Sequence, residues 1–203
     1  MDDKLDFFID IQGLKKVKRC APYHKAFHES VADHSYQMVV LAVNLMSQLK
    51  LDLDYEKVIK LCLYHDLCEL GLENDFDSYA SHINKEISKS KKQYERDTIT
   101  KLASKHNFQE ILTYHSEYEQ QKTEEAKFVR ALDKLEGVLH IIAIPSGKIT
   151  NPKWLAIYCH DAVAQFPKLI PFYLQVEQRL KTRIEQCGFE WVAEYNFKND
   201  RKI

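Results

Sequence analysis

Apolar residues recur at helical spacing along most of this chain, and this pattern limits the possible folds more than any other feature. They fall three or four positions apart between residues 31 and 50, and segments 54–70 and 123–143 repeat the pattern. Glycine and proline are scarce, with 5 of each among 203 residues, which disfavours a turn-rich β fold. No segment alternates polar and apolar residues between turn signals. The sequence therefore predicts an all-α fold.

Capping residues and helix breakers indicate where the helices begin and end. Ser30, Asp54 and Thr123 are candidate N-caps, and Gly71 is placed to end the helix that follows Asp54. The expected helical segments are 3–17, 31–50, 54–70, 83–105, 107–119, 123–143, 152–164 and a last one ending near residue 186. Interruptions are expected at 19–30, at the acidic stretch 72–82, at 145–147, at Pro167 and at Pro171.

The chain shows no internal repeat, low-complexity segment or linker-like stretch. We therefore expect a single domain over residues 1–203, with a core of about 10–145 and C-terminal helices of about 152–186 packed on it. A domain of this length buries a substantial core and has room for an interior cleft.

Charge and cysteine usage exclude several classes of partner. The net charge is -1, and basic residues of segment 83–105 alternate with acidic ones, so we expect no nucleic-acid partner and no membrane. The acidic start MDDKLDFFID differs from the basic start of a signal peptide. The 5 cysteines are odd in number and form no CxxC pair, which is typical of reduced thiols. These features predict a cytoplasmic protein.

The adjacent pair His65-Asp66, within the apolar stretch VIKLCLYHDLCELGL, points to a metal site. Buried ionisable groups are costly unless they are paired, bonded or ligated. Two further candidates, His34 in ESVADHSYQ and Asp133 in FVRALDKLEG, lie in other amphipathic segments. Each of these two alone is more often a structural or surface residue, and the doublet is the stronger signal. We predict that the four residues bind one divalent ion between core helices.

Two imidazoles and two carboxylates favour Mn²⁺, Fe²⁺, Co²⁺, Ni²⁺ or Zn²⁺ over Ca²⁺, without selecting one of them. A second metal is a minor alternative, based on His82, His106 and His115 between the doublet and Asp133. We interpret His140 as a core histidine. The second doublet, His160-Asp161, lacks matching neighbours, and we interpret it as a surface pair.

Three segments, ESVADHSYQ, YHDLCEL and ALDKLEG, resemble the three motifs of the HD superfamily of metal-dependent phosphohydrolases. The segment LKKVKR, ending at Arg19, resembles one that precedes the first histidine in the branch of bacterial 5′-deoxynucleotidases. The resemblance covers roughly residues 10–140. It implies an all-α bundle, often dimeric, in which His34, His65, Asp66 and Asp133 bind one divalent ion. It also implies that Glu69 is the catalytic glutamate.

The resemblance further implies that Arg19 contacts the substrate phosphate, and around this residue the sequence departs from the family pattern. An aromatic residue that helps to exclude a ribose commonly follows the arginine, whereas Cys20-Ala21-Pro22 follow it here. Asn74 stands where an acidic residue is usual, with Glu73 before it and Asp75 after it. A shift of one residue would provide the carboxylate, and we expect Asp75 to be the substrate contact. His24, in the segment after Arg19, is a further candidate substrate contact.

The sequence thus predicts a metal-dependent phosphohydrolase, a phosphomonoesterase of (deoxy)nucleoside 5′-monophosphates, with Glu69 and Asp66 as catalytic residues. The expected partners are a small phosphorylated substrate and a second copy of the chain in a homodimer. The alternatives are an HD phosphodiesterase or pyrophosphohydrolase of signalling nucleotides, and a catalytically silent metal-binding module. The native metal, the base and sugar preference, the oligomeric state and the role of the C-terminal region stay open.

Overall fold

A computed structural model describes residues 2–19, 29–144 and 149–198 of the chain. Within these ranges the secondary structure is helical, apart from two isolated bridges that join Lys18 to Ser30 and to Asn74. The helices are α1 Asp2–Asp10, η1 Ile11–Lys16, α2 Val31–Gln48, α3 Tyr55–Tyr64, η2 Leu67–Glu69, α4 Ser78–Ile83, α5 Lys85–Lys105, α6 Glu110–Gln120, α7 Glu124–Ala143, α8 Pro152–Ile157, α9 His160–Gln165, η3 Pro167–Leu169, α10 Ile170–Gln186 and η4 Ala193–Tyr195. The prediction of an all-α fold is confirmed.

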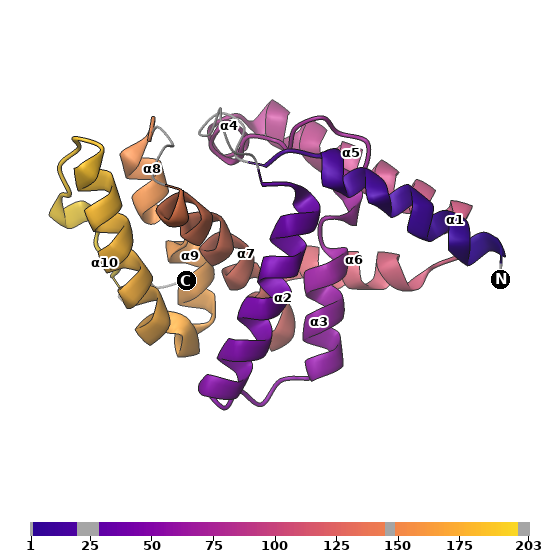
Figure 1. Ribbon diagram of the computed structural model, residues 1–203, viewed down its shortest axis with the longest axis horizontal. Coiled ribbons are helices and arrows are strands. Elements are labelled where there is room, and N and C mark those ends of the chain that lie inside the picture. The colour runs from indigo at the N-terminus through magenta and orange to yellow at the C-terminus, as the bar shows by residue number, and fades with distance from the viewer. Residues whose placement is uncertain (1, 20–28, 145–148, 199–203) are drawn as a thin grey trace.

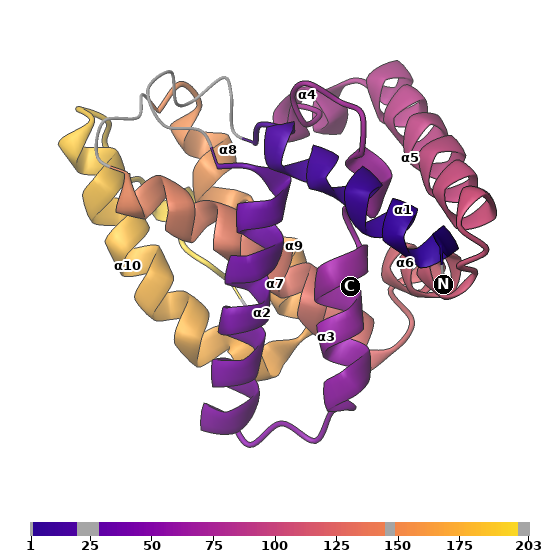
Figure 2. The same ribbon diagram turned by 45° about the vertical axis from the view of Figure 1, so that its right-hand side comes forward.

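Helices α2, α3 and α7 form the centre of the bundle and pack against one another. Helices α8 and α10 lie on one side of them, and α1, α5 and α6 lie on the other, in both Figure 1 and Figure 2, while α9 packs against α7 and α10. Each side has its own apolar core. The first core contains Met38, Leu61, Leu132, Val163 and Tyr173, and the second contains Phe7, Leu14, Leu67, Ile99 and Ile111.

The central helices begin at the predicted capping residues. The Ser30 side chain accepts a hydrogen bond from the backbone N–H of Asp33, and the Asp33 side chain accepts one from the backbone N–H of Ser30. Asp54 caps α3 through Lys57 N, and Thr123 caps α7 through Ala126 N. These side chains satisfy backbone donors that have no partner within the helix, so the local sequence sets the start of each central helix.

Several predicted boundaries are wrong. The expected helix 54–70 ends at Tyr64, and a short 3-10 helix and a turn follow, where Gly71 takes a φ of 95°. The stretch 72–82 contains helix α4, capped by Asp77, and segment 152–164 forms two helices instead of one. Pro171 does not interrupt a helix but lies in the first turn of α10, where its missing N–H has no cost.

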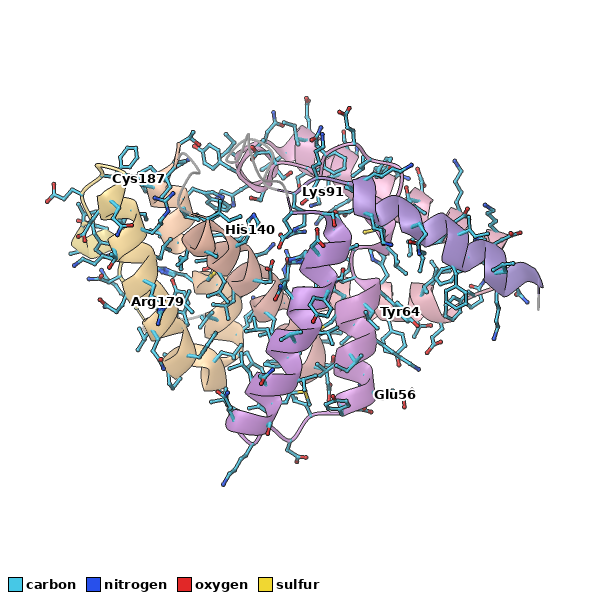
Figure 3. The ribbon with its side chains drawn as sticks, in the orientation of Figure 1. Glu56, Tyr64, Lys91, His140, Arg179 and Cys187 are labelled. Atoms are coloured by element: carbon cyan, nitrogen blue, oxygen red, sulfur yellow. The ribbon has the colours of Figure 1, made fainter. Side chains whose placement is uncertain are left out.

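Surface and core side chains follow the expected division. Charged groups such as Glu56 point away from the helices in Figure 3. Cys62, Cys68 and Cys159 are free thiols in the interior, as predicted for reduced cysteines, while Cys20 lies outside the described residues. Among the described helices, none is long and apolar enough to cross a membrane.

Candidate metal centre and active site

The doublet His65-Asp66 lies at the point where α3 ends. His65 is the C-cap of the helix, and its Nδ1 lies 3.0 Å from the carbonyl oxygen of Cys62. A carbonyl oxygen only accepts, so Nδ1 carries the hydrogen and Nε2 keeps its lone pair. Asp66 follows outside the α-helix, and its Oδ2 lies 3.1 Å from His65 Nε2. The end of the helix therefore lets two consecutive side chains turn to the same side.

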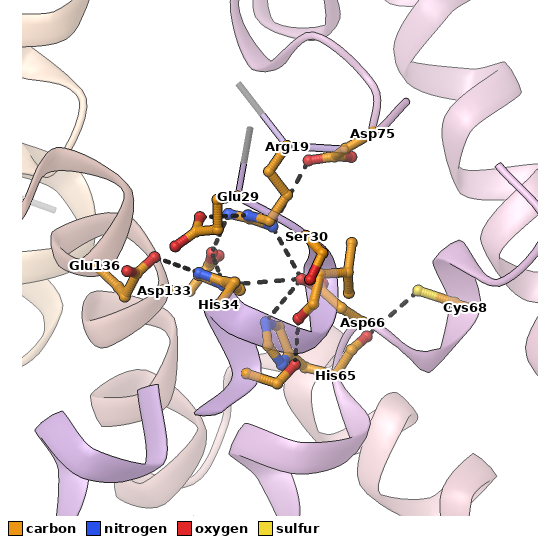
Figure 4. Close-up of polar contacts among 12 residues, drawn as sticks. Arg19, Glu29, Ser30, His34, His65, Asp66, Cys68, Asp75, Asp133 and Glu136 are labelled. Atoms are coloured by element: carbon orange, nitrogen blue, oxygen red, sulfur yellow. Dashed lines mark hydrogen bonds and ion pairs between the residues drawn. The ribbon is translucent and has the colours of Figure 1, made fainter. Parts of the chain in front are cut away.

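His34 on α2 and Asp133 on α7 meet this doublet (Figure 4). His34 Nε2 lies 3.4 Å from Asp133 Oδ1 and 3.8 Å from Asp66 Oδ2. One ligand atom each from His34, His65 and Asp133 lies within 4.8 Å of the other two. The structure thus brings together the four residues that the sequence predicted as metal ligands.

This group has the properties of a divalent-cation site. His34 Nε2 and His65 Nε2 are buried and have no hydrogen-bond partner of good geometry among the described residues. Ligand bonds to such ions are about 2.0–2.2 Å long, so small side-chain rotations would bring these atoms around one ion. The two histidine Nε2 atoms and the carboxylates of Asp66 and Asp133 lie in the interior. This mixture of nitrogen and oxygen ligands fits a borderline-soft divalent metal.

The site lies at the junction of the two apolar cores. Cys62 belongs to the first core and Leu67 to the second, and the doublet stands between them in the chain. His34 likewise lies between Val31 of the second core and Met38 of the first. Rigid packing on both sides therefore holds the polar groups in place.

Arg19 ends the first described segment and reaches into this site. Its backbone N–H donates to the carbonyl of Glu29 at 2.7 Å, and its side chain is buried. The guanidinium lies 3.0 Å from Asp66 Oδ2, 3.7 Å from Asp75 Oδ2 and 3.7 Å from Asp133 Oδ1. A planar cation beside the candidate ligands is well placed to bind an oxyanion, as the sequence predicted for Arg19.

Glu69 and Asp75 form the acidic side of the site. Glu69 is buried on η2, and burial, together with the charges of Asp66 and Asp75, raises its pKa well above the usual value. Asp75 lies close to Arg19 and has Lys91 3.8 Å from its Oδ1. Asn74 instead pairs with Lys18 through its backbone, so Asp75 is the acidic residue that faces the site. The substrate contact expected of Asp75 stays a prediction.

A cavity of about 500 Å³ opens beside these groups. Arg19, the doublet and Glu69 line one end, and aromatic side chains form another part of its wall. Those aromatic residues include Phe76, His82, Trp154 and Tyr158. Trp154 packs against His82 with ring centroids 4.4 Å apart and a tilt of 33°, and it packs edge-on to Tyr158. The cavity joins a polar end to an aromatic wall, and its size suits a small ligand.

Sequence reasoning missed several residues that support the site. The Tyr118 hydroxyl donates a 2.7 Å hydrogen bond to Asp133 Oδ2, and Arg130 donates to the same hydroxyl. Lys134 Nζ lies 3.1 Å from Asp133 Oδ2, and the Asp133 side chain is only 7% exposed, so this adjacent pair is part of the buried site. Lys91, one of the basic residues that alternate with acidic ones in segment 83–105, lines the cavity. Only Lys134, next to Asp133, gave a local signal.

The remaining histidines have different positions. His24 lies outside the described residues, so its predicted contact stays a prediction. His82 and His115 line the cavity, whereas His106 pairs with Asp10 of α1. His140 lies 3.5 Å from Glu29 Oε1. The interpretation of His160 as a surface residue is wrong, because it is buried between the rings of Tyr173 and Phe197.

Comparison with known proteins shows the same family that the motifs suggested. The HD domain family model matches residues 11–157. The chain is 34% identical to 5′-deoxynucleotidase HDDC2 of Xenopus laevis over 140 residues, which cover 68% of this chain and 67% of the relative. It is 31% identical to 5′-deoxynucleotidase HDDC2 of Homo sapiens over 190 residues, which cover 92% and 90%. A predicted metal-dependent phosphohydrolase from Magnetospirillum magnetotacticum MS-1 has the same fold, with a TM-score of 0.68, 20% identity and coverage of 94% and 98%. The chain therefore belongs to the HD-domain family.

Proposed function

We propose that this protein is a divalent-metal-dependent phosphomonoesterase that acts on (deoxy)nucleoside 5′-monophosphates. The observation that carries the proposal is the convergence of His34, His65, Asp66 and Asp133 at one point beside the cavity. The chain's membership of the HD-domain family supports it. The proposed metal ligands are these four side chains. A divalent ion held there would supply the positive charge that polarises a phosphoryl oxygen and lowers the pKa of water.

The protein's own residues account for the other requirements of phosphate ester hydrolysis. Arg19 binds the phosphate oxygens with its planar, charge-assisted donors. Glu69 orients the attacking water and transfers a proton, and Asp66 contributes charge at the reacting phosphate. The water oxygen bonds to phosphorus, the bond from phosphorus to the 5′ oxygen breaks, and a proton goes to the leaving alkoxide. Asp75, next to Arg19, contacts the substrate beyond its phosphate.

The aromatic part of the cavity supports a nucleotide as the substrate. A nucleobase has a flat apolar face, and Trp154, with its flanking rings, offers a surface on which such a face stacks. The matched relatives are named 5′-deoxynucleotidases, which agrees with this substrate class. Glu69 is buried beside the doublet, which argues against a catalytically silent binding module. Burying a carboxyl group is costly, and a module that only binds metal does not require a proton-transfer group there.

We further propose a cytoplasmic homodimer. Buried free thiols suit a reducing compartment. Exposed apolar side chains on α1 and α2, among them Phe8 and Tyr36, offer surface for a second copy. Light scattering of the purified protein tests the dimer, and a monomer at micromolar concentration would contradict it.

Product analysis tests the activity. The purified chain, loaded separately with Mn²⁺, Co²⁺ and Zn²⁺, is given ribo- and deoxyribonucleoside monophosphates, cyclic nucleotides and nucleoside polyphosphates. We expect free phosphate from the monophosphates. A released nucleotide or pyrophosphate from the other substrates, without phosphate from the monophosphates, would identify a phosphodiesterase or pyrophosphohydrolase. No product with any metal would identify a binding module.

A further inference from the structure

Two glutamates beside the candidate metal ligands have no role in the proposed chemistry. Glu29 precedes α2, and Glu136 lies one turn after Asp133 on α7. Their side chains are only 4% and 6% exposed. A buried carboxyl group is costly unless hydrogen bonds or charges compensate for the lost water. Their surroundings therefore indicate what they do.

Glu136 contacts the ring nitrogen of His34 that faces away from the candidate metal position. Its Oε2 is hydrogen-bonded to His34 Nδ1, as Figure 4 shows. A carboxylate oxygen only accepts, so Nδ1 is the nitrogen that carries the hydrogen. In the neutral imidazole the lone pair is then on Nε2, the atom that lies 3.4 Å from Asp133 and 3.8 Å from Asp66. The contact thus selects the tautomer that can bind a metal from Nε2.

Glu29 in turn contacts Glu136. A ligand atom of each lies within 4.8 Å of the other, and Arg19 Nε and His140 Nδ1 each lie 3.5 Å from a Glu29 oxygen. The Arg19 cation therefore offsets part of the cost of burying the two carboxyl groups side by side.

We infer that Glu136 is a positioning residue that sets the tautomer and direction of His34. Outer partners of this kind tune the affinity of metal-binding histidines. The inference depends on the metal site of the proposed function, and it assigns a role to a motif residue that does not touch substrate.

The same atoms allow a different interpretation. Glu29, His34 and Glu136 each offer a ligand atom within 4.8 Å of the others, so their spacing alone would permit a second ion. A second ion would have to take the Nδ1 lone pair of His34, which requires an imidazole stripped of both hydrogens. It would also approach the Arg19 cation, whose Nε lies near Glu29. The hydrogen bond between Glu136 and His34 explains their contact without a fully deprotonated imidazole and without a second cation beside Arg19.

Titration of the purified full-length chain with Co²⁺ tests the inference, because it reports affinity and the number of ions without reference to turnover. We expect one Co²⁺ per chain. Glu136→Ala should weaken Co²⁺ binding by about 10–100-fold. Glu136→Gln keeps an oxygen that accepts from His34 and should stay within about fivefold of the wild type.

Glu177→Ala provides a matched control. Glu177 is also a buried glutamate next to a histidine, with its Oε1 3.6 Å from His160 Nε2, but it lies on α10. This variant should lose thermal stability and keep the Co²⁺ affinity of the wild type. If the loss of any buried glutamate weakened Co²⁺ binding, Glu136→Ala and Glu177→Ala would both bind Co²⁺ more weakly than the wild type.

Three outcomes would overturn the inference. The first is a folded Glu136→Ala variant with unchanged Co²⁺ affinity, and the second is a wild-type chain that binds two ions while this variant binds one. If Glu136→Ala does not fold, a tenfold or greater loss of affinity in Glu136→Gln is the third. A wild-type chain that binds one Co²⁺ but hydrolyses no nucleotide would remove the proposed function and leave this inference standing.

Discussion

The chain contains two His-Asp doublets whose surroundings differ completely. His65-Asp66 faces a second histidine and a second aspartate from two other helices. His160 is packed between the aromatic rings of Tyr173 and Phe197, with their centroids 5.8 and 5.3 Å away. The first doublet is part of a polar cluster at the junction of two cores, and the second anchors one apolar core. A doublet in the sequence therefore does not by itself make a metal site.

Backbone geometry explains part of the difference. His160 and Asp161 are the first two residues of α9, and consecutive side chains on an α-helix diverge by about 100°. Accordingly His160 is buried while Asp161 is exposed. His65 and Asp66 follow the last residue of α3, where the chain leaves the helix and both side chains turn to one side. His34 of α2 and Asp133 of α7 face these two side chains and complete the group of four candidate ligands.

The largest expected effect separates the two histidines. His65→Ala should lose metal and reduce phosphate release by roughly 1000-fold, equivalent to about 4 kcal/mol of barrier. His160→Ala should keep metal content and activity, and it should lose about 1–3 kcal/mol of folding stability because it leaves a buried void. Metal analysis, phosphate assays and thermal melts distinguish the variants. Equal loss of metal in both would show that the comparison is wrong.

The second test concerns the glutamate next to the first doublet. Glu69→Gln should lower turnover by about 10²–10⁴-fold, because the amide cannot transfer a proton. Its metal content should match that of the wild type, since Glu69 is not among the proposed ligands. Metal lost together with activity would make Glu69 a ligand.

Metal removal should affect only the first region. A ligand present at about 100 times its Kd stabilises the folded state by about 2.7 kcal/mol, so chelation of the wild type should lower its Tm. The same shift should persist in His160→Ala and vanish in His65→Ala. A Tm that is unchanged by chelation of the wild type would indicate that no metal binds this fold tightly.

The pH dependence of the metal-free protein provides a fourth test. Burial, despite the opposing charge of Lys91, raises the pKa of Glu95 to about 7 in the folded chain. Its folded pKa lies above its unfolded pKa, so its contribution is present at low pH and is lost as pH rises from about 4.5 to about 7. Glu95→Gln should therefore be about 1–3 kcal/mol more stable than the wild type at pH 8 and similar at pH 4. Denaturant unfolding at both values measures this, and an equal difference at both would contradict it.

The smallest expected effect asks what the C-terminal region contributes to the site. Trp154 of α8 lies on the cavity wall, on the side of the molecule that contains the second doublet. Trp154→Ala should raise KM for nucleoside monophosphates about tenfold, the loss of about 1.4 kcal/mol of stacking. KM for deoxyribose 5-phosphate, which has no base, should not change. A similar rise for both substrates would mean that Trp154 supports the fold and not the base.

Most helices and the four candidate ligands could be predicted from the sequence, because caps and motifs are local signals. Ser30, Asp54 and Thr123 each cap a helix through their own side chain, and the sequence displays them directly. The early end of α3 could not be foreseen, since the apolar pattern continues through Leu67 and Cys68 into the second core. The spacing of apolar residues does not distinguish a continuing helix from a buried turn that follows it.

The contacts that complete the site depend on tertiary structure. Tyr118 of α6 contacts Asp133, and Trp154 of α8 lines the cavity. Both residues lie outside the sequence motifs, so the motifs did not predict these contacts. Glu136 was visible as a letter of the motif ALDKLEG, but its contact with His34 arises only when α2 and α7 pack together. His160 was misplaced because its doublet lacks the neighbours of the metal motif, and that absence says nothing about burial.

The most direct test of the central claim is a crystal structure of the Co²⁺-loaded protein with anomalous diffraction data. We predict one peak, about 2.0–2.3 Å from the Nε2 atoms of His34 and His65 and from carboxylate oxygens of Asp66 and Asp133. A peak at His160, a peak between Glu29 and Glu136, or no peak at the first doublet would contradict it.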